Sequence, residues 1–545
     1  MSVTVFSGGS VFTGHGVRSR PASVAVRDGR IVAVGDRAAA EAAAGPGAQH
    51  VDLAGGLLTP GFQDAHVHPV SAGRQLLQCD LTGYATAAEC VAAVERYAAA
   101  HPDRAWITGG GWAMPVFPGG LATRDLLDAV VADRPVYLPN ADGHGAWVNG
   151  AALARAGIDR HTPDPPDGRI ERDAAGEPTG MLHEGAATLV GKLLPAATAA
   201  DLDAALLAGQ EYLFSHGITA WQDAIVGDYL GGDDNLAAYL RAAGSGALRA
   251  RVVGALWWDR GRGAEQVADL VERRAAGRVG RFAATTVKIM QDGVVENFTA
   301  GLTEPYLDAC GHATANAGLS FVDPEGLRAY VTGLDAAGFQ VHFHALGDRA
   351  VREALDAVEA ARKQNRPGDH RHHLAHLQVV HPDDVARFAV LGAAANLQPL
   401  WACHDPQMDE LTIPFLGPRR AGWQYPFGDL HRAGARLAAG SDWSVSSPNP
   451  LWGAHVAVNR TAPDDEGGEP FLPDQALDLA TILTAYTAGS AYVNHLDHIT
   501  GTLEVGRCAD LAVLDRDPFD HPAAEIGRAR VVRTYVDGEL VYATG

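Results

Sequence analysis

Short apolar bursts separated by turn residues mark both ends of the chain. They cover Val3–Phe6, Ser23–Val26 and Arg30–Val34 at the N-terminus, and Asp510–Leu514 and Val531–Val536 near the C-terminus. An Asp-Gly pair follows the second burst at 28–29 and the last burst at 537–538, as expected for hairpin turns. The two ends are therefore predicted to form one β domain, a β-sandwich of residues 1–56 plus 500–545.

Between the two ends, strand-like apolar runs alternate with Ala- and Leu-rich helical segments such as Pro324–Ala337 and Arg349–Lys363. This alternation is typical of parallel βαβ units. Eight candidate strands favour an α/β fold with a closed (β/α)8 TIM-like barrel over residues 57–499. The candidate strands are Leu57–His66, Ile218–Asp223, Ala250–Trp257, Thr286–Met290, Phe339–His344, His372–Leu377, Ala393–Gln398 and Arg436–Ala439.

A long segment separates the first two candidate strands, from about residue 70 to about residue 215. It has strand-like runs of its own at Arg104–Gly109 and Pro135–Leu138, together with helix-like stretches. We expect an inserted α/β subdomain over residues 75–210, near the mouth of the barrel.

Composition and charge narrow the function classes. The 545 residues would suggest three or four units of about 150 residues, but a barrel with insertions accommodates them. A net charge of −22 argues against a nucleic-acid partner. Neither a signal peptide nor an apolar run of about 18 residues is present, so no membrane span is expected. Five scattered cysteines without CxxC spacing favour a cytoplasmic protein without disulfides.

The strongest chemical signal is the pair His66 and His68 at the end of the first candidate strand. Alternate residues of a strand point to the same side, so the two imidazoles can bind one metal ion together. The alternative is two strand histidines with ordinary hydrogen-bond partners. Their position at a C-terminal strand end, after Thr59-Pro60-Gly61-Phe62, favours the metal.

With five further motifs, this segment resembles the metal-dependent amidohydrolase superfamily, and within it the branch of N-substituted formamide deformylases. The resemblance implies a barrel enzyme that splits a C–N bond with metal-activated water. The motifs follow the family order between residues 57 and 445: LLTPGFQDAHVHP (57–69), DGHGAWVN (142–149), VKIMQDG (287–293), VHFHALGDRA (341–350), HLAHLQ (373–378) and AAGSDWSV (438–445).

The resemblance gives Lys288 a role. Its strand is too apolar to accommodate a free ammonium easily. In relatives, a lysine at this position is carboxylated and bridges two metal ions. The alternative is a lysine paired with Asp292 or Glu296.

Spacing alone cannot choose between His342 and His344, which share a strand face. The resemblance selects His344 as a ligand and leaves His342 in a lower layer. It selects His376 as the next ligand, and we expect the nearby His372 and His373 to be partly solvated.

Asp442 matches the family's catalytic acid and base, which also contacts a metal; a helix N-cap is the alternative. One carboxylate could take a proton from water and return it to the leaving nitrogen. The implied metal set is His66, His68, Lys288, His344, His376 and Asp442. These ligands suit one or two divalent ions, Zn²⁺ first, with manganese, iron or nickel as alternatives.

His144, in the inserted segment, could polarise the substrate carbonyl or bind the substrate; it could equally cap a turn. Four tryptophans near the motifs could form aromatic walls, although core packing is the simpler interpretation. They are Trp112, Trp147, Trp401 and Trp443.

We therefore expect a hydrolase with a small-molecule amide substrate, for which the first hypothesis is an N-substituted formamide. Fold and ligand set do not fix the substrate, so a hydantoinase-type cyclic amidase and an N-acyl amidohydrolase remain alternatives. A non-catalytic regulatory or binding protein on the same scaffold is the alternative from another class. The resemblance also suggests a homodimer.

Overall fold

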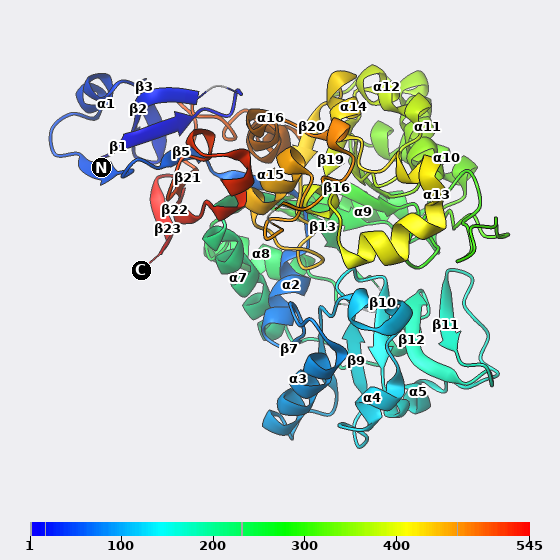
Figure 1. Cartoon of the computed structure of the whole chain (residues 1–545). Coiled ribbons are helices and arrows are strands. Elements are labelled where there is room, and N and C mark those ends of the chain that lie inside the picture. The colour runs from blue at the N-terminus through cyan, green and yellow to red at the C-terminus, as the bar shows by residue number, and fades with distance from the viewer. Residues whose placement is uncertain (1–2, 17, 230–232, 466, 545) are drawn as a thin grey trace.

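The chain folds around a barrel of eight parallel strands, with a sheet from the two chain ends on one side and an inserted sheet below (Figure 1). The computed structural model describes residues 3–16, 18–229, 233–465 and 467–544. Each barrel strand is hydrogen-bonded in parallel to the next. In spatial order the strands are β6 (Phe62–Val67), β13 (Ile218–Val226), β14 (Arg251–Trp257), β16 (Phe282–Met290), β17 (Gln340–Ala345), β18 (His373–His376), β19 (Ala394–Leu397) and β20 (Leu437–Ala439).

The barrel closes just beyond β20. There Asp442 N donates to His66 O at 2.8 Å and His68 N donates to Trp443 O at 2.9 Å. The buried carboxylate of Asp64 joins the same two segments, because it accepts hydrogen bonds from the backbone nitrogens of His66 and Ser441, each at 3.0 Å. Each of the eight predicted regions contains a barrel strand, and the closure places the end of the first strand against the end of the last.

The prediction of one strand over Leu57–His66 was wrong. Residues Leu57–Pro60 form β5 in the terminal sheet, and the barrel strand β6 begins only at Phe62. Gly61 lies between them and packs so closely on Thr219 of β13 that a Cβ atom would lie 2.3 Å from its Oγ1. Because both pieces are fully buried, burial does not mark the break.

Both chain ends contribute to the terminal sheet, as expected. Strands β1 (Val3–Phe12), β2 (Arg18–Arg27), β3 (Arg30–Gly35) and β4 (Gln49–Asp52) join β5, β21 (Leu511–Leu514), β22 (Val531–Val536) and β23 (Glu539–Ala543). The Asp-Gly pairs at 28–29 and 537–538 have positive φ at both residues, between 46° and 77°. Phe6 and Tyr535 contact each other at 5.1 Å although two strands lie between theirs, so the sheet is strongly curved. A two-layered sandwich stays a prediction.

The inserted segment has its own sheet, in the order β11-β12-β10-β9-β8-β7. Its strands are β7 (Cys79–Asp80), β8 (Ile107–Gly110), β9 (Val136–Pro139), β10 (Gly145–Val148), β11 (Gly168–Arg172) and β12 (Pro178–Glu184). The following helix α7 (Ala199–Ser215) packs instead into the barrel core through Leu206 and Phe214. The exact limits of the three domains stay predictions.

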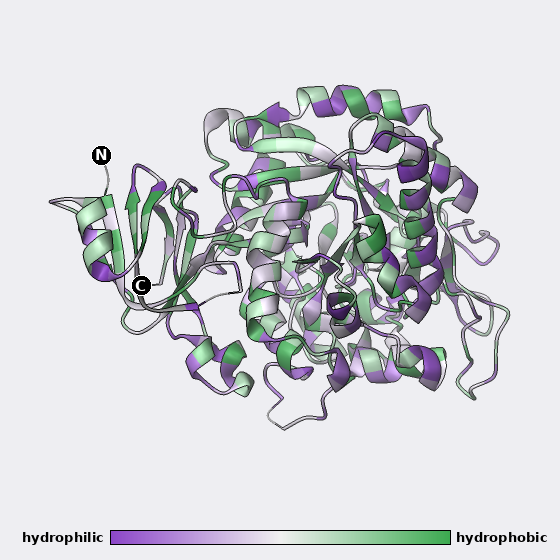
Figure 2. Cartoon of the chain, turned by 90° about the horizontal axis from the view of Figure 1, so that it is seen from above, coloured by the Kyte–Doolittle hydropathy of each residue, from purple (hydrophilic) through white to green (hydrophobic). Residues whose placement is uncertain are grey.

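Amphipathic helices cover the barrel. Helices α10 (Pro324–Ala336) and α11 (Asp348–Gln364) match the two predicted helical segments and bury one apolar face each. In Figure 2 the interior strands are largely hydrophobic, whereas the outer helix surfaces and loops are more hydrophilic. This burial of apolar surface is the main driving force for the fold.

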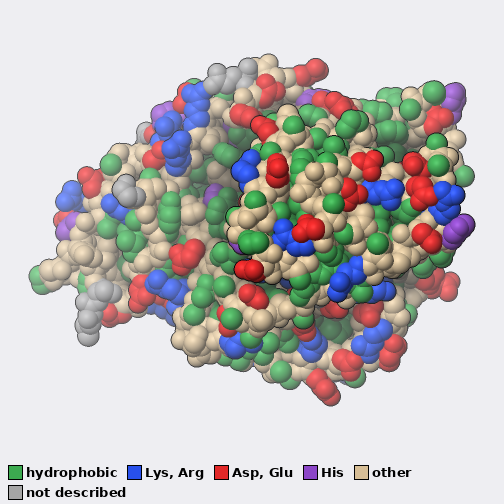
Figure 3. All heavy atoms as spheres, turned by 90° about the horizontal axis from the view of Figure 1, so that it is seen from below, with side chains coloured by type: hydrophobic (Ala, Val, Ile, Leu, Met, Phe, Trp, Pro, Cys, Tyr) green, Lys and Arg blue, Asp and Glu red, His purple; other side chains and the backbone are tan. Residues whose placement is uncertain are grey.

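The surface carries charges of both signs. On the face seen in Figure 3, Asp and Glu side chains are interspersed with Lys and Arg. All five cysteines are free, and only Cys310 is exposed. No helix in the described part of the chain is both long and apolar enough to cross a membrane.

Candidate metal centre

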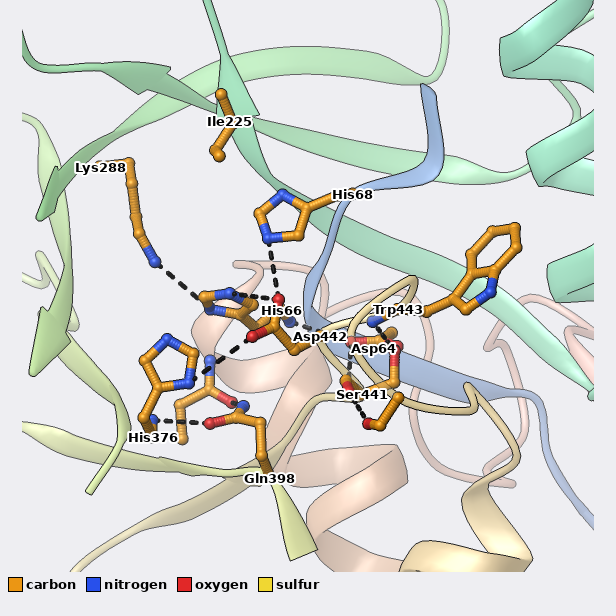
Figure 4. A network of polar contacts seen from close by, with 12 residues as sticks. Asp64, His66, His68, Ile225, Lys288, His376, Gln398, Ser441, Asp442 and Trp443 are labelled. Atoms are coloured by element: carbon orange, nitrogen blue, oxygen red, sulfur yellow. Dashed lines mark hydrogen bonds and ion pairs between the residues drawn. The ribbon is translucent and has the colours of Figure 1, made fainter. Parts of the chain in front are cut away.

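His66 of β6 and His68, which directly follows that strand, both approach the carboxylate of Asp442 (Figure 4). His66 Nε2 lies 3.2 Å and His68 Nε2 lies 2.9 Å from Asp442 Oδ1. Burial alone would raise the pKa of Asp442, but the two neighbouring histidines outweigh it and hold this pKa well below its usual range. The carboxylate is therefore ionised and available as a ligand.

His344 at the end of β17 and His376 at the end of β18 complete a ring of imidazoles. The ring centroids of His344 and His376 are 4.5 Å apart, and those of His66 and His376 are 4.7 Å apart. His376 Nδ1 lies 3.8 Å from Asp442 Oδ2. Donor atoms of His66, His376 and Asp442 all lie within 4.8 Å of one another, which is close enough for one shared ion.

Lys288 extends from β16 toward the same cluster, and its Nζ lies 3.5 Å from His66 Nδ1. Burial lowers its pKa to about 7, against the opposing charge of Asp442. The two acids considered as its partners are engaged elsewhere. Asp292 accepts hydrogen bonds from the backbone nitrogens of Gly301, Leu346 and Gly347, and Glu296 accepts one from the Thr412 hydroxyl.

The polar atoms left over in this cluster fit a cation. Both ring nitrogens of His376 and Nδ1 of His68 are buried and have no hydrogen-bond partner among the described residues. Burial also lowers the pKa of His66 to about 3 and that of His376 to well below its usual value, so both rings are neutral and keep a lone pair. Buried polar atoms are rarely left unpaired, and neutral imidazoles with a carboxylate are typical ligands of zinc and related metals.

His144 lies at the edge of the cluster, with its ring centroid 5.3 Å from that of His344. Its Nδ1 is 3.0 Å from both carboxylate oxygens of Glu184, the last residue of β12. Burial disfavours the charged ring, but Glu184, with Asp142 and Asp442, outweighs it and raises the pKa of His144 to about 9. The ring is therefore a cation held by a carboxylate and does not cap a turn.

Glu184 is a residue that the sequence analysis missed. It also accepts a hydrogen bond from the Thr299 hydroxyl at 2.8 Å, and its backbone has a positive φ of 51°. Its partner His144 lies 40 positions away in the sequence, and the pairing depends on the antiparallel register of β10 and β12. No local pattern in the sequence signals this contact.

A cavity of about 280 Å³ opens onto the cluster, at the small end of the range for ligand pockets. Its lining includes Lys288 and all five predicted histidine and aspartate ligands, together with His144. The aromatic lining consists of Tyr137, Tyr229 and Trp257.

The four tryptophans singled out in the sequence lie elsewhere. Trp112 and Trp147 pack in the core of the insert, which confirms the simpler interpretation for them. Trp401 stacks on the His376 ring at 5.4 Å, and Trp443 stacks on Tyr212 at 4.7 Å.

The remaining histidines near the cluster are also buried. His342 lies below His66, in the lower layer, where its Nε2 is 2.8 Å from His66 Nδ1. The expectation that His372 and His373 are partly solvated was wrong, since their exposed fractions are 5% and 0%. His372 bonds to Asp335, and His373 bonds to Gln222 inside the barrel, so both are held by polar partners in the core.

Comparison with known proteins agrees with this geometry. A model of the amidohydrolase family matches residues 49–542. The chain is 31% identical to the protein LONG AFTER FAR-RED 3 of Arabidopsis thaliana, over 98% of this chain and 90% of that protein. It is 29% identical to the N-substituted formamide deformylase of Arthrobacter pascens, over 95% and 94% of the two chains. The crystal structure of an uncharacterized metal-dependent hydrolase from Pyrococcus horikoshii superposes with a TM-score of 0.74 at 26% identity, over 96% of this chain and 99% of that one. The chain therefore belongs to the amidohydrolase family.

Proposed function

We propose that this amidohydrolase is a metal-dependent hydrolase of a non-peptide amide C–N bond, with N-substituted formamides as its first substrate class. The products would be an amine and formate. The strongest support is that the five proposed histidine and aspartate ligands and Lys288 line one small cavity. Several of the histidine nitrogens lack a hydrogen-bond partner among the described residues, and three of the ligands lie close enough to share an ion. The similarity to the Arthrobacter deformylase supports the choice of substrate.

In this proposal His66, His68, His344, His376 and Asp442 hold the metal, with Lys288 as a further ligand. A divalent ion, most simply Zn²⁺, would polarise the amide carbonyl and lower the pKa of water at the site. The proposal covers one or two ions.

The surroundings of Lys288 support its carboxylation. Only a neutral amine can attack CO₂, and a lysine whose pKa is about 7 is largely neutral slightly above that pH. In the reaction the amine forms a bond to the carbon of CO₂ and releases one proton. The resulting carbamate is an anionic oxygen ligand, which suits a divalent ion better than an ammonium does.

Asp442 transfers the proton in this proposal, and His144 stabilises charge. Asp442 accepts a proton from water on the cavity side and returns it to the departing nitrogen. The cationic ring of His144, fixed by Glu184, stabilises negative charge that develops on the carbonyl oxygen. The aromatic side chains of the cavity pack against the substituent on nitrogen.

A substrate panel tests the proposal. Zinc-loaded protein is incubated with N-benzylformamide, a hydantoin, an N-acyl amino acid and an Xaa-Pro dipeptide, and formate, amine and the remaining substrate are quantified for each. We expect equimolar formate and amine from the formamide and none from the His66→Ala variant. If only another member of the panel is hydrolysed, its class replaces the formamides as the proposed substrate. A protein that neither holds stoichiometric metal nor turns over any member of the panel would favour a non-catalytic binding protein.

A further inference from the structure

A chain of buried amides and imidazoles runs through the barrel below the metal ligands. Gln340 is hydrogen-bonded to Gln222, Gln222 to His342, and His342 to His66. The heavy-atom distances are 3.1, 2.7 and 2.8 Å. Each of the four side chains is at most 3% exposed, so water does not compete for these contacts.

The first link fixes which way the amide of Gln340 points. Its Nε2 lies 2.8 Å from Arg371 O and 2.7 Å from Val493 O. Backbone carbonyls can only accept hydrogen bonds, so the amide nitrogen must face them. The oxygen of Gln340 therefore faces Nε2 of Gln222, and it also accepts a hydrogen bond from the Thr286 hydroxyl at 2.7 Å.

The second link fixes Gln222 in turn. Because its nitrogen donates to Gln340, its oxygen faces His342 Nδ1 at 2.7 Å. His342 Nδ1 must then carry the proton. A neutral imidazole has only one N–H, so His342 Nε2 is an acceptor.

An independent contact supports the same orientation of Gln222. Asn396 donates through Nδ2 to Ala65 O at 2.9 Å and to His373 Nδ1 at 3.2 Å. His373 therefore carries its proton on Nε2, which lies 3.1 Å from the Gln222 oxygen. Two imidazole N–H groups from different strands thus converge on one amide oxygen.

The last link reaches the metal centre. Since His342 Nε2 is an acceptor, His66 must donate from Nδ1 at 2.8 Å, while Lys288 Nζ is farther away at 3.5 Å. His66 Nε2 then has a free lone pair on the side of Asp442. If Gln222 were turned over, the protons would move and His66 Nε2 would be blocked by its own hydrogen.

We propose that Gln340, Gln222 and His342 act as positioning residues that set the tautomer of His66 and thereby prepare its Nε2 for the metal. This inference rests on the proposed function, because it takes His66 as a metal ligand. Partners that orient ligands from outside the coordination sphere typically change metal affinity by about 10–100-fold.

The affinity of the apo-protein for Zn²⁺, measured in competition with a chromogenic chelator, tests this inference. Gln222→Met keeps the shape of the side chain but removes both hydrogen-bonding groups, and we expect about 10–100-fold weaker binding. Gln222→Glu is the rescue variant, because a protonated carboxyl offers one acceptor to His342 and one donor to Gln340. It should bind zinc as the wild type does.

Gln210→Met is the matched control for stability. Gln210 is equally buried and bonds to Ala247 O, Arg249 N and Ala250 N, but it lies on α7, outside this chain of contacts. It should leave zinc affinity unchanged at a comparable loss of thermal stability. If Gln222→Met does not fold, His342→Leu replaces it, since it removes the acceptor that holds the proton of His66 on Nδ1 and should weaken zinc binding too.

The outcomes separate this inference from the proposed function. Wild-type affinity in Gln222→Met, or equal losses in Gln222→Met and Gln222→Glu, would overturn the inference alone. A wild-type protein that binds no zinc would overturn the inference together with the proposed function.

Discussion

Two of the proposed metal ligands have backbone conformations that most residues avoid. His376 has a φ of 79° and Asp442 a φ of 56°. The backbone nitrogen of His376 donates to the Gln398 side chain at 2.6 Å, and that of Asp442 donates to His66 O at 2.8 Å. Such strained residues persist only where the surrounding structure holds them, and they concentrate at functional sites. The strain at these two residues is therefore a local argument for function.

Asp442→Asn should separate folding from chemistry. Asn tolerates a positive φ about as well as Asp, so the thermal midpoint should change little. Removal of the titrating carboxylate should lower kcat by about 10²–10⁴-fold, the usual contribution of a general acid or base. Near-normal turnover of the accepted substrate, measured with metal content and melting temperature as controls, would rule out the proton-shuttle role.

Glu184→Gln should change the pH dependence of turnover. In the wild type the pKa of His144 is about 9, so its charge is present below that pH and lost above it. Without the carboxylate, burial should dominate and lower this pKa, so the alkaline limb of kcat should move to lower pH. An unchanged pH profile, with metal content also unchanged, would show that the charge on His144 has no part in turnover.

At the scale of elements, most strands follow from the sequence because each is a short apolar run bounded by turn residues. The break at Gly61 does not follow, because it depends on which sheet each half of the run joins, and that is decided by Thr219 and by β21. The gathering of the proposed ligands at strand ends was expected from spacing and resemblance. Glu184, Gln222 and Gln340 were not, because their partners are brought to them only by tertiary packing.

Gly61→Ala should destabilise the protein, because the added methyl group would overlap the Thr219 side chain. Overpacking of this kind typically costs about 1–3 kcal/mol. Gly333→Ala, in helix α10, is the matched control, since a Cβ atom there meets nothing within 4 Å. It should stabilise the helix by about 0.5–1 kcal/mol, so thermal denaturation should shift in opposite directions for the two variants. Shifts of the same sign would contradict this account of Gly61.

At the scale of the whole molecule, the terminal sheet and the barrel are tied together. Arg251 of β14 lies 2.8 Å from Asp510, and the Thr534 hydroxyl of β22 donates to Phe214 O of α7 at 2.7 Å. The residues proposed to hold the metal are equally distributed, because they come from β6 and the residue that follows it, from β16, β17 and β18, and from the segment after β20. An ion bound there would link most of the barrel.

Metal removal should therefore lower the melting temperature of the whole protein. A ligand present at about 100 times its Kd stabilises the native state by about 2.7 kcal/mol. Scanning fluorimetry with excess Zn²⁺ and with a chelator should give clearly different midpoints for the wild type. His66→Ala should melt at nearly the same temperature in both conditions, and a wild type insensitive to both would argue against a bound ion.

The meeting of the first and last barrel strands has a consequence for biosynthesis. The ribosome synthesises His66 and His68 early. Asp442, whose backbone nitrogen donates to His66 O, is synthesised only after nearly four hundred further residues. The interval between the synthesis of β5 and that of its neighbour β21 is even longer. A nascent or truncated chain that stops short of these segments has neither a closed barrel nor the full set of proposed ligands, so the site is assembled in one late step.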